Sequence, residues 1–264
     1  MSFQLVPAAP APVLRGTVVE YRAYRFDDPA PPAQPEHPSA CVPMIVDLGS
    51  GWHVAAPANG HRPVRMGSFV AGMHDAFALV GAAGPALGVQ VDLSPVGARR
   101  LLGVPMHELV NRAVPLEDLL GAEARSLAER LAEAPGWPER FAILDAALAR
   151  RVAEAPEVAP EIDWAWRRLV ATAGAVPVGE LGSSLGWSRK RLAARFRDEI
   201  GLTPKTAARV VRFHALLRRL RSDGAATPWA DRAAAAGYFD QSHMVRDVRR
   251  FAGVTPTELL ARFT

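Results

Sequence analysis

The pattern of hydrophobic and polar positions changes about halfway along the chain. Up to residue 93, short runs rich in Val, Ile, Tyr, Phe and Trp are bounded by Gly, Pro, Asn and Asp, which is typical of β-strands. These runs lie within 13–26, 41–49, 52–56, 67–72, 76–81 and 86–93. Short strands at such close spacing predict a small antiparallel β-barrel or sandwich.

Helical spacing of hydrophobic residues begins after this β-rich stretch. Leu127 and Leu131 are four residues apart within 122–134, and Leu144 and Leu148 repeat the spacing within 138–155. We expect two amphipathic helices that close the first domain. Their apolar stripes can be buried within that domain or against a second subunit.

Prolines then mark a boundary between two domains. The segment PEVAPE, residues 156–161, would interrupt a helix, so we expect a β-rich domain at 1–155, a linker at 156–161 and a second domain at 162–264. Residues 27–40 are also proline-rich and predict an extended loop. The second domain is helical throughout, with helices expected within 161–173, 178–185, 188–200, 204–220, 228–236 and 241–251 and from residue 256. The predicted fold class is α+β.

The second domain contains an internal repeat. The stretch SRKRLAARFRDEIGLTP superposes on DQSHMVRDVRRFAGVTP with Gly201 on Gly253. Each copy follows a short helix that ends at a glycine, Gly186 or Gly237, with an aromatic residue next to it. Glycine permits the positive φ that leaves the first helix sharply, and a polar residue then caps the next helix. Both copies therefore predict a helix-turn-helix, and the second turn is one residue longer.

Each basic helix of the repeat has one apolar face and one polar face. Met244, Val248 and Phe251 share the buried face of the second helix, and Leu192 and Phe196 share that of the first. The opposite faces suit a DNA major groove. The side chains expected to contact DNA are Arg189, Lys190, Arg191, Ala193, Ala194 and Arg197 in the first copy and Gln241, Ser242, His243, Arg246, Arg249 and Arg250 in the second.

The segment between the two copies predicts a rigid spacer. A helix from Pro204 to about Leu220 is about 25 Å long at 1.5 Å per residue. Such a rod can hold two recognition helices about 34 Å apart, which is one turn of DNA. One chain could then read two successive major grooves.

Composition and charge support a polyanionic partner. The chain of 264 residues carries a net charge of +4, but residues 1–160 sum to −4 and residues 161–264 to +8. A basic domain beside an acidic one favours DNA, since neutralised phosphates release counterions. No membrane-spanning run or secretory signal is apparent, so a cytoplasmic location is expected.

The second domain resembles the DNA-binding domain of the AraC/XylS family of bacterial transcription regulators. The resemblance rests on LGWSRKRLAARFRDEIGLTP, RVVRFHALLRRL and AAAAGYFDQSHMVRDVRRFAGVTPTELL. It implies an amino-terminal sensor or dimerisation domain, favours a homodimer and allows contact with RNA polymerase. Ala193 and Ala194 depart from the larger polar side chains common in the family, so base reading in the first copy should depend on Lys190 and its arginine neighbours.

Other chemistry is weakly indicated. His53, His61 and His74 lie among the predicted strands, but their spacing matches no metal motif, and the single cysteine, Cys41, reads as a buried thiol. No nucleophile or dinucleotide motif is present, so we expect no catalytic residue, metal or cofactor. Trp164, Trp166, Trp187 and Trp229 are expected to anchor the core of the second domain.

The sequence thus predicts a sequence-specific DNA-binding transcription regulator, not an enzyme, that responds to a small-molecule effector or a partner through its first domain. The alternative is a small-molecule-binding or enzymatic β-barrel whose helical domain mediates assembly. The doubled motif and the basic charge favour the regulator.

Overall fold

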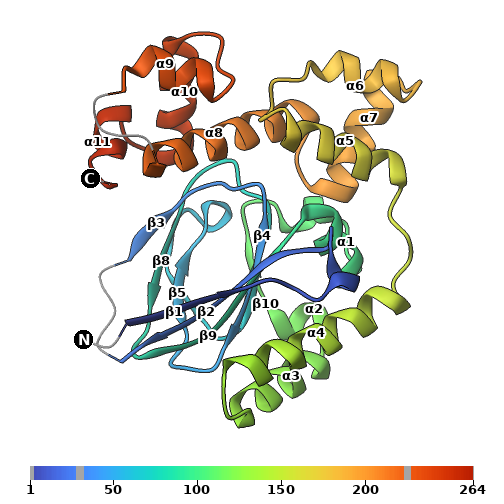
Figure 1. Cartoon of the computed structure of the whole chain (residues 1–264), viewed down its shortest axis with the longest axis vertical. Helices are drawn as coiled ribbons and strands as arrows, with labels where there is room; N and C mark the ends of the chain where they lie inside the picture. Colours follow the sequence, from blue (N-terminus) through green and yellow to red (C-terminus); the bar gives the residue numbers. More distant parts are fainter. Residues whose placement is uncertain (1–2, 28–32, 223–226, 264) are drawn as a thin grey trace.

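Two antiparallel β-sheets form the amino-terminal half of the protein (Figure 1). A computed structural model describes residues 3–27, 33–222 and 227–263. The larger sheet has the order β1-β2-β9-β4-β7-β10 and the smaller one β3-β8-β5-β6. The strands are β1 (Phe3–Ala8), β2 (Val18–Phe26), β3 (Gln34–Glu36), β4 (Val42–Asp47), β5 (Trp52–Ala55), β6 (Val64–Met66), β7 (Phe69–Ala71), β8 (Ala78–Ala82), β9 (Ala86–Leu93) and β10 (Ala113–Pro115).

The alternation along the strands divides the core into two layers. Met44 and Val46 of β4 point to the helices and join the large core. Ile45 between them joins a small cluster with Phe69 of β7 in the same sheet and Val54 of β5 in the smaller sheet. The sheets therefore pack as an open pair. The barrel that the sequence analysis allowed is not formed, because β1 and β10 are the two ends of the larger sheet and do not pair with each other.

The proline-rich segment is only partly an extended loop. Residues 34–36 form β3, which pairs with β8 at the edge of the smaller sheet. A proline is tolerated on an edge strand because its missing N–H need not bond to a neighbour. Residues 28–32 of the expected loop lie outside the described part of the chain.

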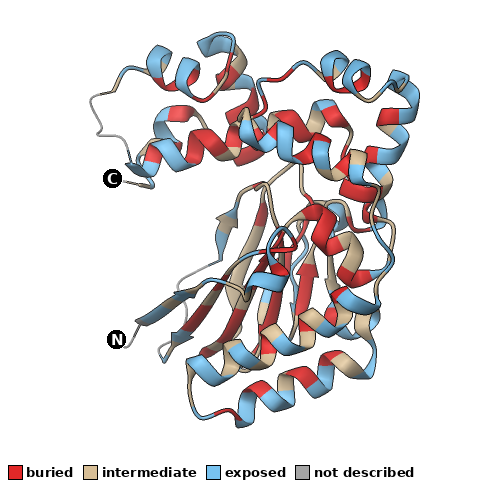
Figure 2. Cartoon of the chain, turned by 45° about the vertical axis from the view of Figure 1, so that its right-hand side comes forward, coloured by how far each residue is buried: buried red, intermediate tan, exposed pale blue. Residues whose placement is uncertain are grey.

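Helices cover one side of the larger sheet (Figure 1). They are α1 (Pro95–Leu102), α2 (Leu116–Leu120), α3 (Ala122–Glu133) and α4 (Trp137–Glu154), with short 3-10 turns η1 (Pro12–Leu14), η2 (Pro57–Asn59) and η3 (Met106–Leu109). Leu127 and Leu131 of α3 and Leu144 and Leu148 of α4 are all buried within this domain. The outer faces of α3 and α4 are exposed (Figure 2). No second subunit is needed to cover the leucine stripes.

The carboxy-terminal half is helical, as predicted. It consists of α5 (Pro160–Ala171), α6 (Val178–Ser184), α7 (Arg189–Ile200), α8 (Pro204–Ser222), α9 (Trp229–Ala235), α10 (Gln241–Ala252) and α11 (Pro256–Leu260). In Figure 1, α8 runs between the group formed by α5, α6 and α7 and the group formed by α9, α10 and α11. Trp166 is a core anchor, but Trp164 is 38% exposed and the expectation for it is wrong, because it lies on the outer face of α5.

One hydrophobic core runs through both halves. It includes Val91 and Leu101 beside the sheet, Met106 of η3, and Ile200 and Phe213 of the helical half. Within the described residues, no helix is both long and apolar enough to cross a membrane.

Candidate nucleic-acid interface

Two short turns set the directions of α7 and α10. Gly186 and Gly237 both have positive φ, 63° and 80°, where a side chain would be strained. Ser188 Oγ then accepts a hydrogen bond from Arg191 N at 3.2 Å, and Asp240 Oδ1 accepts one from His243 N at 2.6 Å. Both predicted caps are confirmed, and each fixes the amino-terminal end of a basic helix.

The apolar faces of the two helices point inward, as predicted. Leu192 and Phe196 of α7 are buried, and so are Met244, Val248 and Phe251 of α10. The side chains at i, i+4 and i+7 share one face, which leaves the intervening basic residues on the outside.

Most of the side chains predicted to contact DNA are exposed. In α7 the exposed ones are Arg189, Lys190, Arg191, Ala194 and Arg197, and in α10 they are Gln241, Ser242, Arg246, Arg249 and Arg250. Ala193 is half-buried. His243 is also half-buried, because its ring meets the edge of Tyr238 at 5.2 Å and its Nε2 lies 3.9 Å from Asp247 Oδ2. The guanidinium of Arg191 lies over the ring of Trp187 at 4.4 Å, which orients this side chain beside the turn.

The spacer helix α8 links the two helix-turn-helix units, the first formed by α5, α6 and α7 and the second by α9, α10 and α11. Arg209 donates to Asp247 Oδ1 of α10 from Nε at 2.9 Å and from Nη2 at 2.6 Å, and Asp247 is 1% exposed. Arg212, one turn further along, donates to the carbonyl of Gly174 in the first unit at 2.6 Å and lies over the ring of Tyr238 in the second. Two arginines of α8 therefore link both units.

The amino-terminal domain contacts the end of the first basic helix. Helix α7 packs against α1 and η3, and Arg99 Nε of α1 lies 3.6 Å from Glu199 Oε2. A Cβ on Gly201 would come within 2.9 Å of the carbonyl oxygen of Met106 and 3.0 Å of Val110. Only glycine fits here without displacing η3.

The amino-terminal domain also contacts the end of the second basic helix, α10. Arg250 Nη2 lies 2.6 Å from Asp75 Oδ2, and Asn111 holds that carboxylate by donating from Nδ2 to Asp75 Oδ1 at 2.8 Å. These two bonds hold the pKa of Asp75 below its usual range, against the upward effect of its partial burial. A Cβ on Gly253 would meet the ring of Phe77 at 2.7 Å.

One short segment therefore serves both contacts. Residues 106–111 begin against Gly201 of the first unit and end at Asn111, which positions Asp75 for the second unit. The sequence contains no pattern that relates this segment to the two basic helices.

The described residues provide no cluster of three or more His, Cys, Asp or Glu side chains that could hold a metal ion. His53 is exposed, His61 stacks on Phe77 at 5.0 Å, and His74 donates from Nδ1 to the carbonyl oxygen of Gly72. Cys41 is half-buried, and burial raises the pKa of its thiol to about 12.

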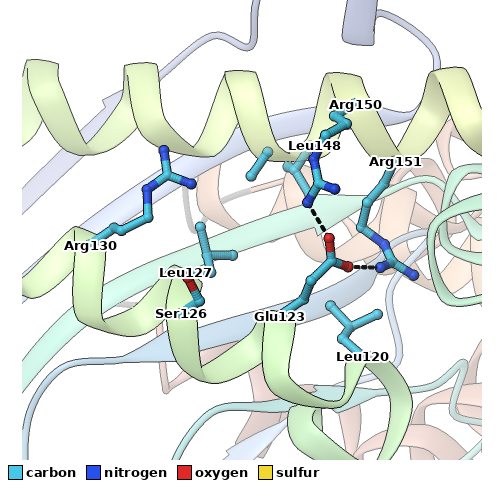
Figure 3. Close-up of a pocket in the computed structure, with 9 residues that line it drawn as sticks. Leu120, Glu123, Ser126, Leu127, Arg130, Leu148, Arg150 and Arg151 are labelled. Atoms are coloured by element: carbon cyan, nitrogen blue, oxygen red, sulfur yellow. Dashed lines mark hydrogen bonds and ion pairs between the residues drawn. The ribbon is translucent and has the colours of Figure 1, made fainter.

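A small pocket lies between α3 and α4 (Figure 3). Its volume is about 50 Å³, and Leu127 and Leu148 form part of its wall. Glu123 of α3 pairs with Arg150 and Arg151 of α4 across its mouth. A pocket for a small organic ligand has a volume of roughly 300 Å³ or more, so this one is a packing defect at a helix junction.

Comparison with known families agrees with this geometry. A helix-turn-helix domain of the AraC type matches residues 181–262, and a domain of unknown function, DUF6597, matches residues 7–115. The chain is a transcription regulator whose carboxy-terminal part is a DNA-binding domain of this type. No curated protein matches the sequence of this regulator.

Solved structures of ToxT from Vibrio cholerae share the fold of the regulator over its whole length. The apo form of a ToxT variant from strain SCE256 has 10% identity and a TM-score of 0.50, and the match covers 100% of this chain and 98% of that one. ToxT from strain O395 bound to (E)-4-(8-methylnaphthalen-1-yl)but-3-enoic acid has 10% identity, a TM-score of 0.50 and 100% coverage of both chains. At this identity the likeness concerns the fold.

Three features of the regulator carry little or no signal in a local sequence pattern. Asp247 looks like one more charge on a basic helix, yet it is buried against α8. Asp75 lies in a loop far from the motif it contacts. Phe239 is the extra residue of the second turn, and that difference in length was the only indication of it.

Proposed function

We propose that the regulator recognises a specific DNA sequence by placing the amino-terminal halves of α7 and α10 in two successive major grooves. The observation that carries this proposal is the pair of capped helix ends, whose exposed side chains face away from a shared core. Helix α8 has 19 residues and is therefore about 28 Å long, which suits a separation of one DNA turn.

Each set of side chains has its own role in the proposed complex. Lys190, Gln241 and Ser242 lie within the first turn of a capped helix and are assigned to base edges, together with Arg246 one turn later. Ala194 is suited to apolar contact with a thymine methyl group. Arg197 and Arg249, near the other helix ends, are assigned to phosphates.

The test begins with operators selected from random DNA by the full chain. Arg246→Ala should relax the base preference at one position of the second half-site, with a loss of roughly 1–3 kcal/mol on the preferred base. Arg249→Ala should weaken binding to all sequences alike and reduce the salt dependence by about one phosphate contact. Selection that returns no consensus would disprove sequence-specific reading.

Regulation is proposed to act through the contacts that the amino-terminal domain makes with both units. Residues 106–111 support Gly201 of the first unit and, through Asn111 and Asp75, Arg250 of the second. A signal that shifts this segment would change the relative placement of α7 and α10. The sensor role expected for the domain then has a physical route to DNA.

For the effector we infer a small organic acid at the seam between the domains. One ToxT structure of this fold holds a butenoic acid, and the seam of this chain brings basic groups together. The His37 ring meets Phe213 of α8 at a centroid distance of 6.0 Å, and Arg221 and Arg262 act on it electrostatically. A rise in melting temperature with such an acid, lost in Arg221→Ala and kept in the control Arg130→Ala, would support the site.

Partners other than DNA belong to the same proposal. Since the leucine stripes of α3 and α4 are buried in their own domain, a homodimer would need another surface, and light scattering on the full chain with and without operator tests it. Contact with RNA polymerase is expected only where the operator lies beside a promoter. The alternative of a catalytic barrel with a helical assembly domain is disfavoured by the open sheet pair and the capped basic helices.

A further inference from the structure

One large apolar side chain of the helix-turn-helix is almost fully in solvent. Phe239 is 93% exposed, far more than any other exposed large hydrophobic residue described for the chain, such as Val13 at 66% or Trp164 at 38%. Exposing a phenyl ring forgoes about 2 kcal/mol of burial. An aromatic ring placed so openly beside a binding surface points to a partner that covers it.

The ring is presented by a rigid backbone. Tyr238 before it is 5% exposed, and its amide donates to the carbonyl of Ala233 at 2.9 Å. Asp240 after it is fixed as the cap of α10 by its bond to His243 N. Phe239 is therefore held from both sides, and little conformational entropy remains to be lost when the ring is covered.

Its position adjoins the surface proposed to read DNA. Gln241 and Ser242 follow within three residues and are exposed at the amino-terminal end of α10, and Arg246 is exposed one turn later. In the first unit the aromatic Trp187 is followed directly by the cap Ser188, so Phe239 has no counterpart there. The extra residue of the second turn adds an apolar contact to an otherwise polar and cationic edge.

We propose that Phe239 packs against thymine 5-methyl groups at the edge of the major groove entered by α10. The thymine methyl group is the one apolar feature that base pairs present in the major groove, and phenylalanine is among the side chains that contact it. The proposal rests on the proposed DNA reading by α10 and names a base that this helix selects.

The test asks whether the effect of removing the Phe239 ring depends on the presence of a particular thymine methyl group. The full chain and its Phe239→Ala variant are titrated with the selected operator and with operators in which single thymines of the second half-site are replaced by deoxyuridine, which lacks only the methyl group. We expect Phe239→Ala to weaken binding about tenfold. At one or two thymines, loss of the methyl group should weaken the wild type several-fold and leave the variant unchanged.

Val170→Ala provides the matched control, because Val170 is an exposed apolar residue of the same domain, on α5. It should leave affinity unchanged, and both variants should melt like the wild type since each ring or methyl removed lies in solvent. Phe239→Leu should recover part of the affinity.

Two results would overturn the inference while leaving the proposed function intact. One is unchanged affinity of Phe239→Ala for the operator; if transcriptional output were lost at the same time, a protein would be the partner that covers the ring. The other is a loss of affinity in Phe239→Ala that is the same whether or not the operator thymines carry their methyl groups. Failure of the wild type to select any operator would instead remove the proposed function itself.

Discussion

Arg250 on the second basic helix and Asp75 in the amino-terminal domain are 175 residues apart in the chain and form an ion pair at 2.6 Å. Asn111 holds the carboxylate from its other side. The same arginine was predicted from the sequence to contact DNA. The carboxylate of the first domain and a DNA phosphate can therefore compete for one guanidinium.

Asp75→Asn should raise the affinity for the operator by about twofold to fivefold, because Arg250 is released for a phosphate. The size follows from a half-exposed ion pair, which is worth about 0.2–1 kcal/mol. Fluorescence anisotropy at fixed salt measures the effect. The gain should disappear in the Arg250→Ala background, and weaker binding by Asp75→Asn alone would show that the pair assists DNA binding.

Gly201→Ala should disrupt the contact between the carboxy-terminal end of α7 and η3. Gly201 has a φ of 96°, and its Cβ would clash with the carbonyl of Met106. Gly186→Ala is the matched control, since its φ is 63° and nothing lies within 4 Å of its Cβ. Both variants should lose about 1 kcal/mol to backbone strain, but only Gly201→Ala should increase hydrogen exchange in residues 105–111. Equal exchange in the two variants would argue against docking at this glycine.

Asp247→Ala should destabilise the helical half by about 3 kcal/mol, because it leaves Arg209 without its buried partner. Urea unfolding of the full chain measures this loss. Arg246→Ala changes the adjacent residue, which is exposed, and should weaken DNA binding with little change in stability. A stability loss of the same size in both variants would contradict the inward placement of Asp247.

Stability should fall as the pH is lowered from about 6.5 toward 4. Burial, with Arg262 and Arg221 adding to it, lowers the pKa of His37 from 6.5 to about 4. The folded state therefore favours the neutral ring, and between these values the unfolded chain binds more protons. The free energy of unfolding therefore has its full value, as far as His37 is concerned, above about pH 6.5 and decreases as the pH falls toward 4. Burial also lowers the pKa of His74 and of His214, so these residues add to the same pH dependence. The effect of His37 alone is measured by comparing melting temperatures of the wild type and His37→Gln across this pH range. The decline should be smaller in the variant, and parallel curves would exclude His37.

Local chemistry made the helical half predictable. Caps and glycines encode where a helix begins and ends, so α7, α8 and α10 start within one residue of the predicted positions. The strand β9 was also predicted with its full extent, because Val89, Val91 and Leu93 alternate with polar residues along it. The edge strands β1, β3, β6 and β10 were missed, since short edge strands with few buried residues lack the alternation that marks a strand.

The contacts between the two halves were not predictable in the same way. Asp75 and Arg250 show no periodicity that relates them, and Gly201 reads equally well as an ordinary helix-ending glycine. Such pairs depend on how the sheet domain docks, which is a property of the folded chain. The exposed set on α7 and α10 was predicted from helical spacing, and its contact with DNA stays a prediction.

The segment 106–111 supports the ends of both basic helices, and α8 ties the same helices together through Arg209 and Arg212. These attachments leave the pair little freedom to twist about the axis of α8. The regulator should then be sensitive to helical phasing. An operator with half a DNA turn inserted between its two parts would present the second part on the opposite side of the duplex, where this braced pair of helices cannot follow it.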